Sequence, residues 1–288
     1  MEQKNKQFLG WIALDIDGTI TLDKYSVPDP VTEFLRSRIH EGWRLAIATG
    51  RPLTFALMGL EKFDFPFLLL AQNGTIAIEM PSKKVLLKRY IPISRISEID
   101  LAFEGTVGDF VVFSGYENHD QVYWRPKRQD AEKINYVEDF AKKQGLLLIA
   151  VDSFDQISWK SIPLVKCFGT QIEMKRIANN LNKNHHFNLS IICDPYVENY
   201  YIMLITDRLA SKGQTLEEAI ALFGPRKIVI AGGDDENDAS LLKAADIKIA
   251  MAHAPESLMS VADFVAPPTS EQGIIHALRL AIAKAFTG

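Results

Sequence analysis

The chain has 288 residues, of which 47% are hydrophobic and 24% are charged, and its formal net charge is -4. A chain of this length can bury one large core or two smaller ones, so two compact domains, or one domain with a sizeable insertion, are expected. The mildly acidic balance provides no general field that would attract nucleic acid or an anionic membrane, and neither is expected as a partner. Any anionic ligand would have to be held by a local site.

No segment of the sequence suggests export or a membrane span. The apolar run that follows the polar residues 1–8 covers only residues 9–14, which is too short for a signal peptide. No stretch approaches the roughly 20 apolar residues that a membrane span requires. Cys167 and Cys193 lie in apolar segments and form no CxxC pair, so buried thiols and a cytoplasmic location are expected.

Short apolar runs alternate with helical patterns along the chain, which predicts an α/β fold with a largely parallel sheet. Four runs are predicted to be buried strands that each end at polar or glycine-rich residues: 11–14, 44–48, 67–71 and 227–231. In open α/β sheets the carboxyl ends of the strands form the ligand crevice. The polar residues that follow these strands are therefore expected to converge there.

The pattern changes between about residues 88 and 206. Strand-like runs such as residues 110–113 alternate there with helical stretches such as residues 130–144, without comparable polar loops. We therefore predict a core domain made of residues 1–87 and 207–288, with an inserted domain at residues 88–206.

The first polar cluster is Asp15-Ile16-Asp17-Gly18-Thr19. Alternation along an extended chain would turn both carboxylates to the same side. Such a pair can divide the work of catalysis, because one carboxylate stays ionised as nucleophile and metal ligand while the other exchanges protons. Gly18 would permit a tight turn and the close approach of an anion. The structural alternative is a loop in which the aspartates only form Asx-turns.

Three further loops carry candidate ligands. Thr49-Gly50-Arg51 follows the second predicted strand, where a hydroxyl and backbone N–H groups suit a phosphate oxygen, although threonine is also a common helix N-cap. Asn73-Gly74 follows the third strand and by itself indicates a turn. Lys212, just before a predicted helix, would offset the negative charge of a transferring phosphoryl group, whereas an isolated lysine is more often exposed.

The acidic segment Gly232-Gly233-Asp234-Asp235-Glu236-Asn237-Asp238 follows the last of these strands. An acidic run is usually solvated surface, but this one begins at a crevice position. Asp234 is placed to give Mg²⁺ a hard oxygen ligand, with Asn237 and Asp238 facing the same pocket. The sequence contains no Gly-x-Ser-x-Gly, Walker lysine loop or Gly-x-Gly-x-x-Gly, which argues against a serine hydrolase, a P-loop enzyme and a dinucleotide enzyme.

Taken together and in this order, these residues resemble the haloacid dehalogenase (HAD) superfamily, in particular its Cof-type phosphatases of subfamily IIB. The resemblance spans almost the whole chain and implies a Rossmann-like parallel-sheet core with an inserted α/β cap domain. The matching residues, in the order of the four family motifs, are Asp15 with Asp17, Thr49, Lys212, and Asp234 with Asn237 and Asp238. The C-terminal segment is also similar, but family members usually have Gly-Asn where this chain has Ala252-His253.

The resemblance implies a Mg²⁺-dependent phosphatase that hydrolyses a small phosphorylated metabolite, such as a sugar phosphate or a related monoester, through an aspartyl-phosphate. Asp15 would be the nucleophile, Asp17 the general acid and base, and Lys212 the catalytic cation. Phosphate would be bound by Thr49, Gly50, Lys212 and Asn237. Mg²⁺ would be held by Asp15, Asp234 and the main-chain carbonyl of Asp17, with Asp238 supporting them. The expected substrate contacts are Asn73, Gly74 and Arg51.

Two other functions remain open. A sugar phosphomutase shares these motifs but returns the phosphoryl group to its substrate. A non-catalytic binding module would be expected to have lost at least one of the charged motif residues, all of which are present. The inserted domain is expected to set substrate specificity. Its aromatic and basic residues could line the pocket or cover the surface, and the surface is expected for most of them; they include Tyr123, Trp124, Arg125, Lys127, Arg128 and Lys160. The sequence predicts neither the identity of the substrate nor the oligomeric state.

Overall fold

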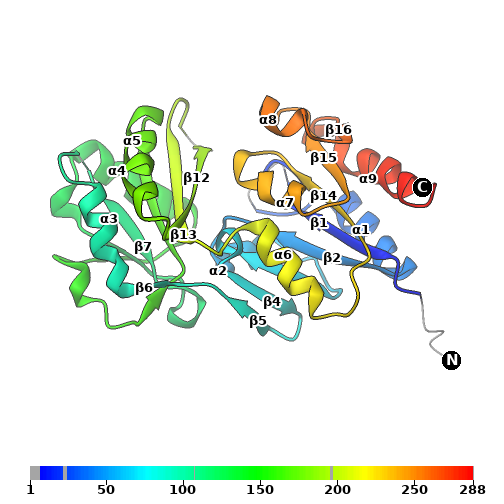
Figure 1. Ribbon diagram of the computed structural model, residues 1–288, viewed down its shortest axis with the longest axis horizontal. Helices are drawn as coiled ribbons and strands as arrows, with labels where there is room; N and C mark the ends of the chain where they lie inside the picture. The colour runs from blue at the N-terminus through cyan, green and yellow to red at the C-terminus, as the bar shows by residue number, and fades with distance from the viewer. Residues whose placement is uncertain (1–6, 22–24, 107, 195–196, 288) are drawn as a thin grey trace. The chain divides into compact units, whose positions relative to one another are not determined.

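A computed structural model describes residues 7–21, 25–106, 108–194 and 197–287. The chain divides into two compact units (Figure 1). The core unit comprises Met1–Gly50, Ala56–Lys88 and Ser211–Gly288, and the inserted unit comprises Arg51–Phe55 and Arg89–Ala210. Among the described helices, none combines the length and apolar character needed to cross a membrane.

The core unit is built on an eight-stranded sheet in the order β16-β15-β14-β1-β2-β3-β4-β5. The strands from β16 to β3 are parallel, and β4 and β5 are antiparallel additions at one edge. The strands are β1 (Gly10–Leu14), β2 (Trp43–Ala48), β3 (Phe67–Ala71), β4 (Ile76–Met80), β5 (Lys84–Lys88), β14 (Ile228–Gly233), β15 (Ile247–Met251) and β16 (Phe264–Ala266). The helices are α1 (Asp29–Glu41), α6 (Lys212–Ala221), α7 (Ala239–Lys243), α8 (Glu256–Met259) and α9 (Gly273–Ala285), and α2 (Leu53–Gly59) begins in residues assigned to the inserted unit.

The central strands of this sheet are apolar along their whole length because helices cover both faces. Every residue of β1 is buried. Ala13 and Ala231 pack in one cluster with side chains of α6 and α7. Their neighbours Leu14 and Gly232 face the opposite side, where Ile274 of α9 lies close to Gly232.

The order in which the chain adds strands to the sheet reverses between β1 and β14. From β1 the chain adds β2 and β3 on one side, and from β14 it adds β15 and β16 on the other (Figure 1). Leu14 at the end of β1 pairs with Gly232 of β14 and with Ile47 of β2. Because ligands of open α/β sheets bind at such a switch point, the loops after β1 and β14 form the expected binding crevice.

The inserted unit contains a six-stranded sheet in the order β12-β13-β11-β7-β8-β9 and a two-stranded ribbon of β10 and β6. The larger sheet is antiparallel except where β8 pairs with β9. The strands are β6 (Ile91–Pro92), β7 (Phe110–Phe113), β8 (Val122–Trp124), β9 (Leu148–Ala150), β10 (Ser161–Ile162), β11 (Leu164–Gly169), β12 (Phe187–Cys193) and β13 (Tyr201–Asp207). The helices are α3 (Ile96–Ala102), α4 (Ala131–Lys143) and α5 (Gln171–Leu181).

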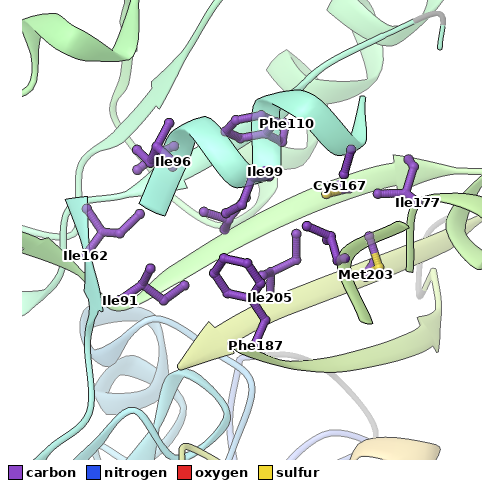
Figure 2. Close-up of a cluster of buried hydrophobic side chains, with 14 of the residues drawn as sticks. Ile91, Ile96, Ile99, Phe110, Ile162, Cys167, Ile177, Phe187, Met203 and Ile205 are labelled. Atoms are coloured by element: carbon purple, nitrogen blue, oxygen red, sulfur yellow. The ribbon is translucent and has the colours of Figure 1, made fainter. Parts of the chain in front are cut away.

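This second sheet has an apolar cluster on each face. Figure 2 shows one of them, in which Ile99 of α3 and Ile177 of α5 pack with Phe110, Cys167 and other strand residues. On the opposite face, Val137 and Phe140 of α4 pack against β7. The inserted unit therefore has hydrophobic clusters of its own, separate from those of the core unit.

Two of the six aromatic and basic residues named for the inserted unit do not lie at the surface. Trp124 and Arg125 are buried, with 5% and 3% of their surface exposed. The Arg125 guanidinium donates to both Asp109 and Asp100, so its charge is matched inside the unit. Lys127, Arg128 and Lys160 are exposed, and Tyr123 is half-buried. The expectation of a buried thiol holds for Cys167 but fails for Cys193, which lies exposed at the end of the edge strand β12.

Candidate active site

Asp15 is the first residue after β1, and its carboxylate is buried at the switch point of the sheet. Its backbone N–H donates to the Gly232 carbonyl (3.0 Å), which continues the ladder with β14 by one bond. The chain then turns at Gly18, whose φ of +77° favours glycine. An added Cβ there would also overlap the Asp234 carboxylate. Glycine at position 18 therefore lets the turn after β1 lie directly against the acidic loop after β14.

Lys212 joins two of the site's carboxylates. Its Nζ lies 2.5 Å from Asp15 Oδ1 and 2.6 Å from Asp238 Oδ1, and all three side chains are buried. The sequence predicts Lys212 just before a helix, whereas the structure makes it the first residue of α6, after the N-cap Ser211. A buried lysine with two carboxylate partners is a fixed positive charge, as the neutralisation of a phosphoryl group requires.

Helices α6 and α7 approach each other closely, and this brings Lys212 to Asp238. Gly213 lies so near the Ser240 carbonyl that an added Cβ would overlap it, and the Gly213 N–H donates to Ser240 Oγ (3.2 Å). The first turn of α6 thereby lies beside the start of α7. Any larger residue at 213 would push Lys212 away from its partners.

Asp238 organises the acidic loop. Its Oδ2 accepts from the backbone N–H groups of Asp234 (3.0 Å) and Asp235 (3.2 Å), while Oδ1 accepts from Lys212. The three donors satisfy a carboxylate that is completely buried. Asp238 thus fixes both the loop that carries Asp234 and the position of the Lys212 ammonium.

Thr49, Asn73 and Gly74 lie in loops that are tied to one another and to α6. The Asn73 N–H donates to the Thr49 carbonyl (2.8 Å), and Thr215 Oγ1 of α6 donates to the Gly74 carbonyl (2.7 Å). Asn73 has a φ of 59° and Gly74 a φ of 86°, which places a left-handed turn after β3. The loops after β2 and β3 are therefore fastened to the first turns of the helix that begins with Lys212.

The concentration of carboxylates changes the ionisation of the site. Burial, and then the neighbouring Asp238 carboxylate, raise the pKa of Asp15 well above its ordinary value. Burial also raises the pKa of Asp234, and that of Asp235 to about 6. Although burial opposes it, the carboxylates of Asp15 and Asp238 raise the pKa of Lys212. One ammonium does not offset this much negative charge, so further positive charge is favoured here.

The donor set fits a hard divalent cation. Asp15, Asp234 and Asp238 can each offer an oxygen so that all three oxygens lie within 4.8 Å of one another. Asp238 already accepts from Lys212 and two backbone N–H groups. Carboxylate oxygens grouped in this way are the ligands that Mg²⁺ or a similar ion prefers.

The sequence profile of haloacid dehalogenase-like hydrolases matches residues 12–278. The chain belongs to this family. The match extends from β1 through the inserted unit to α9 and so includes every loop of the site. The family and the fold class predicted from the sequence are confirmed, as is the type of enzyme, a HAD-type hydrolase.

Several relatives to which this chain is similar are named as phosphatases. Phosphatase YwpJ of Bacillus subtilis is 24% identical over 286 residues, which cover 93% of this chain and 98% of the relative. Pyridoxal phosphate phosphatase YbhA of Escherichia coli is 25% identical over 88% of this chain and 92% of the relative. Among solved structures, the HAD subclass IIB sugar phosphatase BT4131 has a TM-score of 0.75 and 23% identity, over 94% of this chain and 98% of that one.

The remaining predicted HAD site residues have different surroundings. Gly50 and Asn237 are half-buried in the loops after β2 and β14. Asp17 lies in the turn after β1 and bridges to Thr21. Arg51 clusters with the inserted unit, where its guanidinium lies 4.5 Å from the centre of the Phe55 ring. Its role as a substrate contact stays a prediction.

Sequence reasoning assigned no role to two residues that contact Asp234. Thr19 Oγ1 donates to Asp234 Oδ1 (3.1 Å), and His253 Nε2 lies 3.2 Å from Asp234 Oδ2. The hydrogen bond to Asp234 raises the pKa of His253. Thr19 belongs to the segment that begins with Asp15, and Ala252-His253 departs from the pattern usual in the family. The unusual histidine at position 253 is the one sequence signal for its role, but the sequence does not reveal which residue His253 contacts.

Proposed function

We propose that this HAD enzyme is a Mg²⁺-dependent phosphatase that hydrolyses a small phosphorylated metabolite, a sugar phosphate or a related monoester, through an aspartyl-phosphate on Asp15. The observation that carries the proposal is the buried Asp15 carboxylate, 2.5 Å from the Lys212 ammonium at the switch point of the sheet. A carboxylate there can act as a nucleophile while the adjacent lysine reduces its repulsion from a phosphate. We further propose a cytoplasmic location.

The reaction divides into two displacements at phosphorus. In the first, an Asp15 oxygen forms a bond to phosphorus while the ester P–O bond breaks, and Asp17 gives a proton to the departing alcohol oxygen. In the second, Asp17 takes a proton from water, the water oxygen bonds to phosphorus, and the bond between phosphorus and Asp15 breaks. Inorganic phosphate and free Asp15 result. Lys212, Thr49 and Asn237 hold the phosphoryl oxygens in both steps.

Mg²⁺ would be held by the Asp15 carboxylate, the Asp234 carboxylate and the Asp17 main-chain carbonyl. When bound, it would supply the positive charge that lets anionic carboxylates and an anionic substrate share one site. The support for this assignment is the clustering of Asp15 and Asp234 with Asp238, whose own oxygens already accept three N–H groups.

The test is phosphate release from a panel of sugar phosphates, phosphoglycerate-like acids, nucleotides and pyridoxal phosphate. We expect Mg²⁺-dependent release that excess EDTA abolishes, and a covalent phosphoryl group on Asp15 detectable by mass spectrometry after acid quenching. Full turnover in EDTA would refute the metal assignment, and labelling of a different residue would refute the nucleophile.

A sugar phosphomutase is the alternative within the same superfamily. It would convert one sugar phosphate into an isomer without releasing phosphate, so both products are measured in the same reaction. A protein inactive on the whole panel with Mg²⁺ would instead favour a non-catalytic binding module.

We also propose that residues 88–206 act as a mobile cap that sets specificity. The support is that Asp15, Asp17, Lys212 and Asp234 all belong to the core unit, while the inserted unit has hydrophobic clusters of its own. Substitutions in the inserted unit would then mostly alter KM and the ranking of substrates. A uniform loss of kcat with unchanged preference would contradict this division of labour.

A further inference from the structure

Asp234 is held through both of its carboxylate oxygens. Thr19 Oγ1 donates to Oδ1 (3.1 Å), and His253 Nε2 is within hydrogen-bond distance of Oδ2 (3.2 Å). The two partners approach from different parts of the chain, because Thr19 follows β1 and His253 follows β15. A carboxylate fixed at both oxygens is restricted in its rotation, which a freely exposed aspartate is not.

His253 lies on an anchored turn, although its side chain is 48% exposed. The Ala254 N–H donates to the Met251 carbonyl (2.9 Å), which closes the turn after β15. Ala250 before the turn, and Ala254 and Leu258 after it, are buried in a cluster with Leu242 of α7. The backbone that carries His253 is thus fixed by apolar packing on both sides of the turn.

A second hydrogen bond connects the segment after β15 to the acidic loop after β14. Ser257 Oγ donates to Glu236 Oε1 (2.6 Å), so the segment after β15 contacts the loop after β14 at two points. This second contact keeps His253 beside Asp234 without relying on the imidazole alone.

The pair of His253 and Asp234 also lies against the turn that follows the nucleophile. An added Cβ at Gly18 would lie 3.0 Å from His253 Nε2 and would overlap Asp234 Oδ2. Thr269 Oγ1 donates to the Gly18 carbonyl from a third loop. The turn that follows Asp15 and Asp17 is therefore packed against Asp234 by residues that take no part in phosphoryl transfer.

We propose that His253 and Thr19 are positioning residues that together orient the Asp234 carboxylate for its divalent cation. This inference rests on the proposed function, because it presupposes the metal site. His253 acts as the donor of an Nε2–H to Oδ2, which holds the carboxylate as hydrogen-bond partners of metal ligands generally do. Among the described residues, the set with mutually close ligand atoms is Asp15, Asp234 and Asp238. His253 is outside that set, so we assign it a contact with a ligand and no bond to the ion.

The test measures Mn²⁺ binding to the full-length protein by electron paramagnetic resonance, which does not depend on turnover. His253→Ala and Thr19→Val each remove one contact to Asp234 and are expected to weaken Mn²⁺ affinity roughly tenfold. Two rescue variants retain the donors: His253→Gln, whose Nε2 reaches as far from the backbone as that of histidine, and Thr19→Ser. Both are expected to bind Mn²⁺ nearly as the wild type does.

His40→Ala, on α1, is the matched control for loss of a histidine, and circular dichroism checks that each variant is folded. Unchanged or tighter Mn²⁺ binding by His253→Ala would overturn the inference while leaving the metal site intact. Equal losses in His253→Gln and His253→Ala would also overturn it, because a hydrogen bond would then not be the operative contact. A wild-type protein that binds no Mn²⁺ would overturn the proposed metal site and this inference together.

Discussion

Each unit of this protein holds a cluster of charged side chains that is at least partly buried, and the two clusters are balanced differently. In the inserted unit, the Arg125 guanidinium makes two bonds to Asp109 (2.6 and 2.7 Å) and contacts Asp100, which also accepts from Arg128. In the core unit, the carboxylates of Asp15, Asp234 and Asp238 lie close together, and the Lys212 ammonium contacts Asp15 and Asp238. The first cluster pairs two cations with two anions, whereas the second has an excess of negative charge.

This difference separates structural charges from functional ones. Two like charges about 4 Å apart repel by about 4 kcal/mol at an effective dielectric constant of about 20. A neutral cluster gains nothing from an added ion, but an anionic cluster is stabilised by one. The burial of charge alone therefore does not indicate a site, whereas buried charge without balance does.

The largest expected effect is on catalysis. Asp15→Asn should reduce kcat by roughly 10⁴-fold or more, because an amide of the same shape is a poor nucleophile. The same change removes a carboxylate whose pKa is raised by burial, so the metal-free variant should be at least as stable as the wild type. Phosphate release and thermal unfolding, measured side by side, check both expectations. Near wild-type kcat would require another nucleophile.

Removal of a charge from the balanced cluster around Arg125 should instead destabilise the protein. Arg125→Met leaves Asp109 buried without its partner, which should lower the free energy of unfolding by about 3 to 5 kcal/mol. Arg128→Met is the matched control, because Arg128 shares Asp100 but its side chain is 56% exposed. It should cost less than about 1 kcal/mol. Urea denaturation measures both, and equal effects would refute the contrast between the clusters.

Addition of Mg²⁺ should stabilise the wild type in a pH-dependent manner. The pKa values of Asp15 and Asp234 are raised in the folded protein, so the metal-free protein loses stability as the pH rises through these values. Part of this loss involves Asp235, whose pKa moves from 3.8 to about 6.

Because Mg²⁺ binds the ionised carboxylates, the increase in Tm should be larger near about pH 7.5 than near about pH 5.5. At a concentration of about 100 Kd the gain would be about 2.7 kcal/mol. Differential scanning fluorimetry with and without Mg²⁺ measures it, with Asp15→Asn as the control that should gain less. A gain that shrinks as the pH rises would contradict the assignment.

The smallest effect concerns a local contact in the inserted unit. Thr170 caps α5 by accepting from the Glu173 N–H, and the Glu173 side chain accepts from the Thr170 N–H. Thr170→Ala should lower the free energy of unfolding by about 1 kcal/mol. Thr170→Ser, which retains the cap, should have little effect, and thermal unfolding distinguishes the two variants.

Much of the core unit could be predicted from local pattern. The apolar runs marked the central strands, and the polar residues directly after them marked the loops, because both features depend on neighbours in the sequence. Residues 67–71 form β3 as predicted, and the predicted strand at residues 11–14 begins one residue earlier. The predicted end of the strand at residues 227–231 is wrong, because β14 continues through Gly232 and Gly233. The sequence pattern assigns these glycines to the loop, since strands rarely include them.

The sequence by itself determined which residue types follow each strand, and therefore the family and the kind of chemistry. Only the tertiary structure decided which charges are buried and what they contact. Lys212 lies 197 residues from Asp15 in the chain, and Arg125 lies 16 residues from Asp109, yet both pairs are in contact. The contact between His253 and Asp234 likewise spans 19 residues. Periodicity reports the environment of a single element, whereas such contacts depend on the packing of several elements at once, which no local pattern contains.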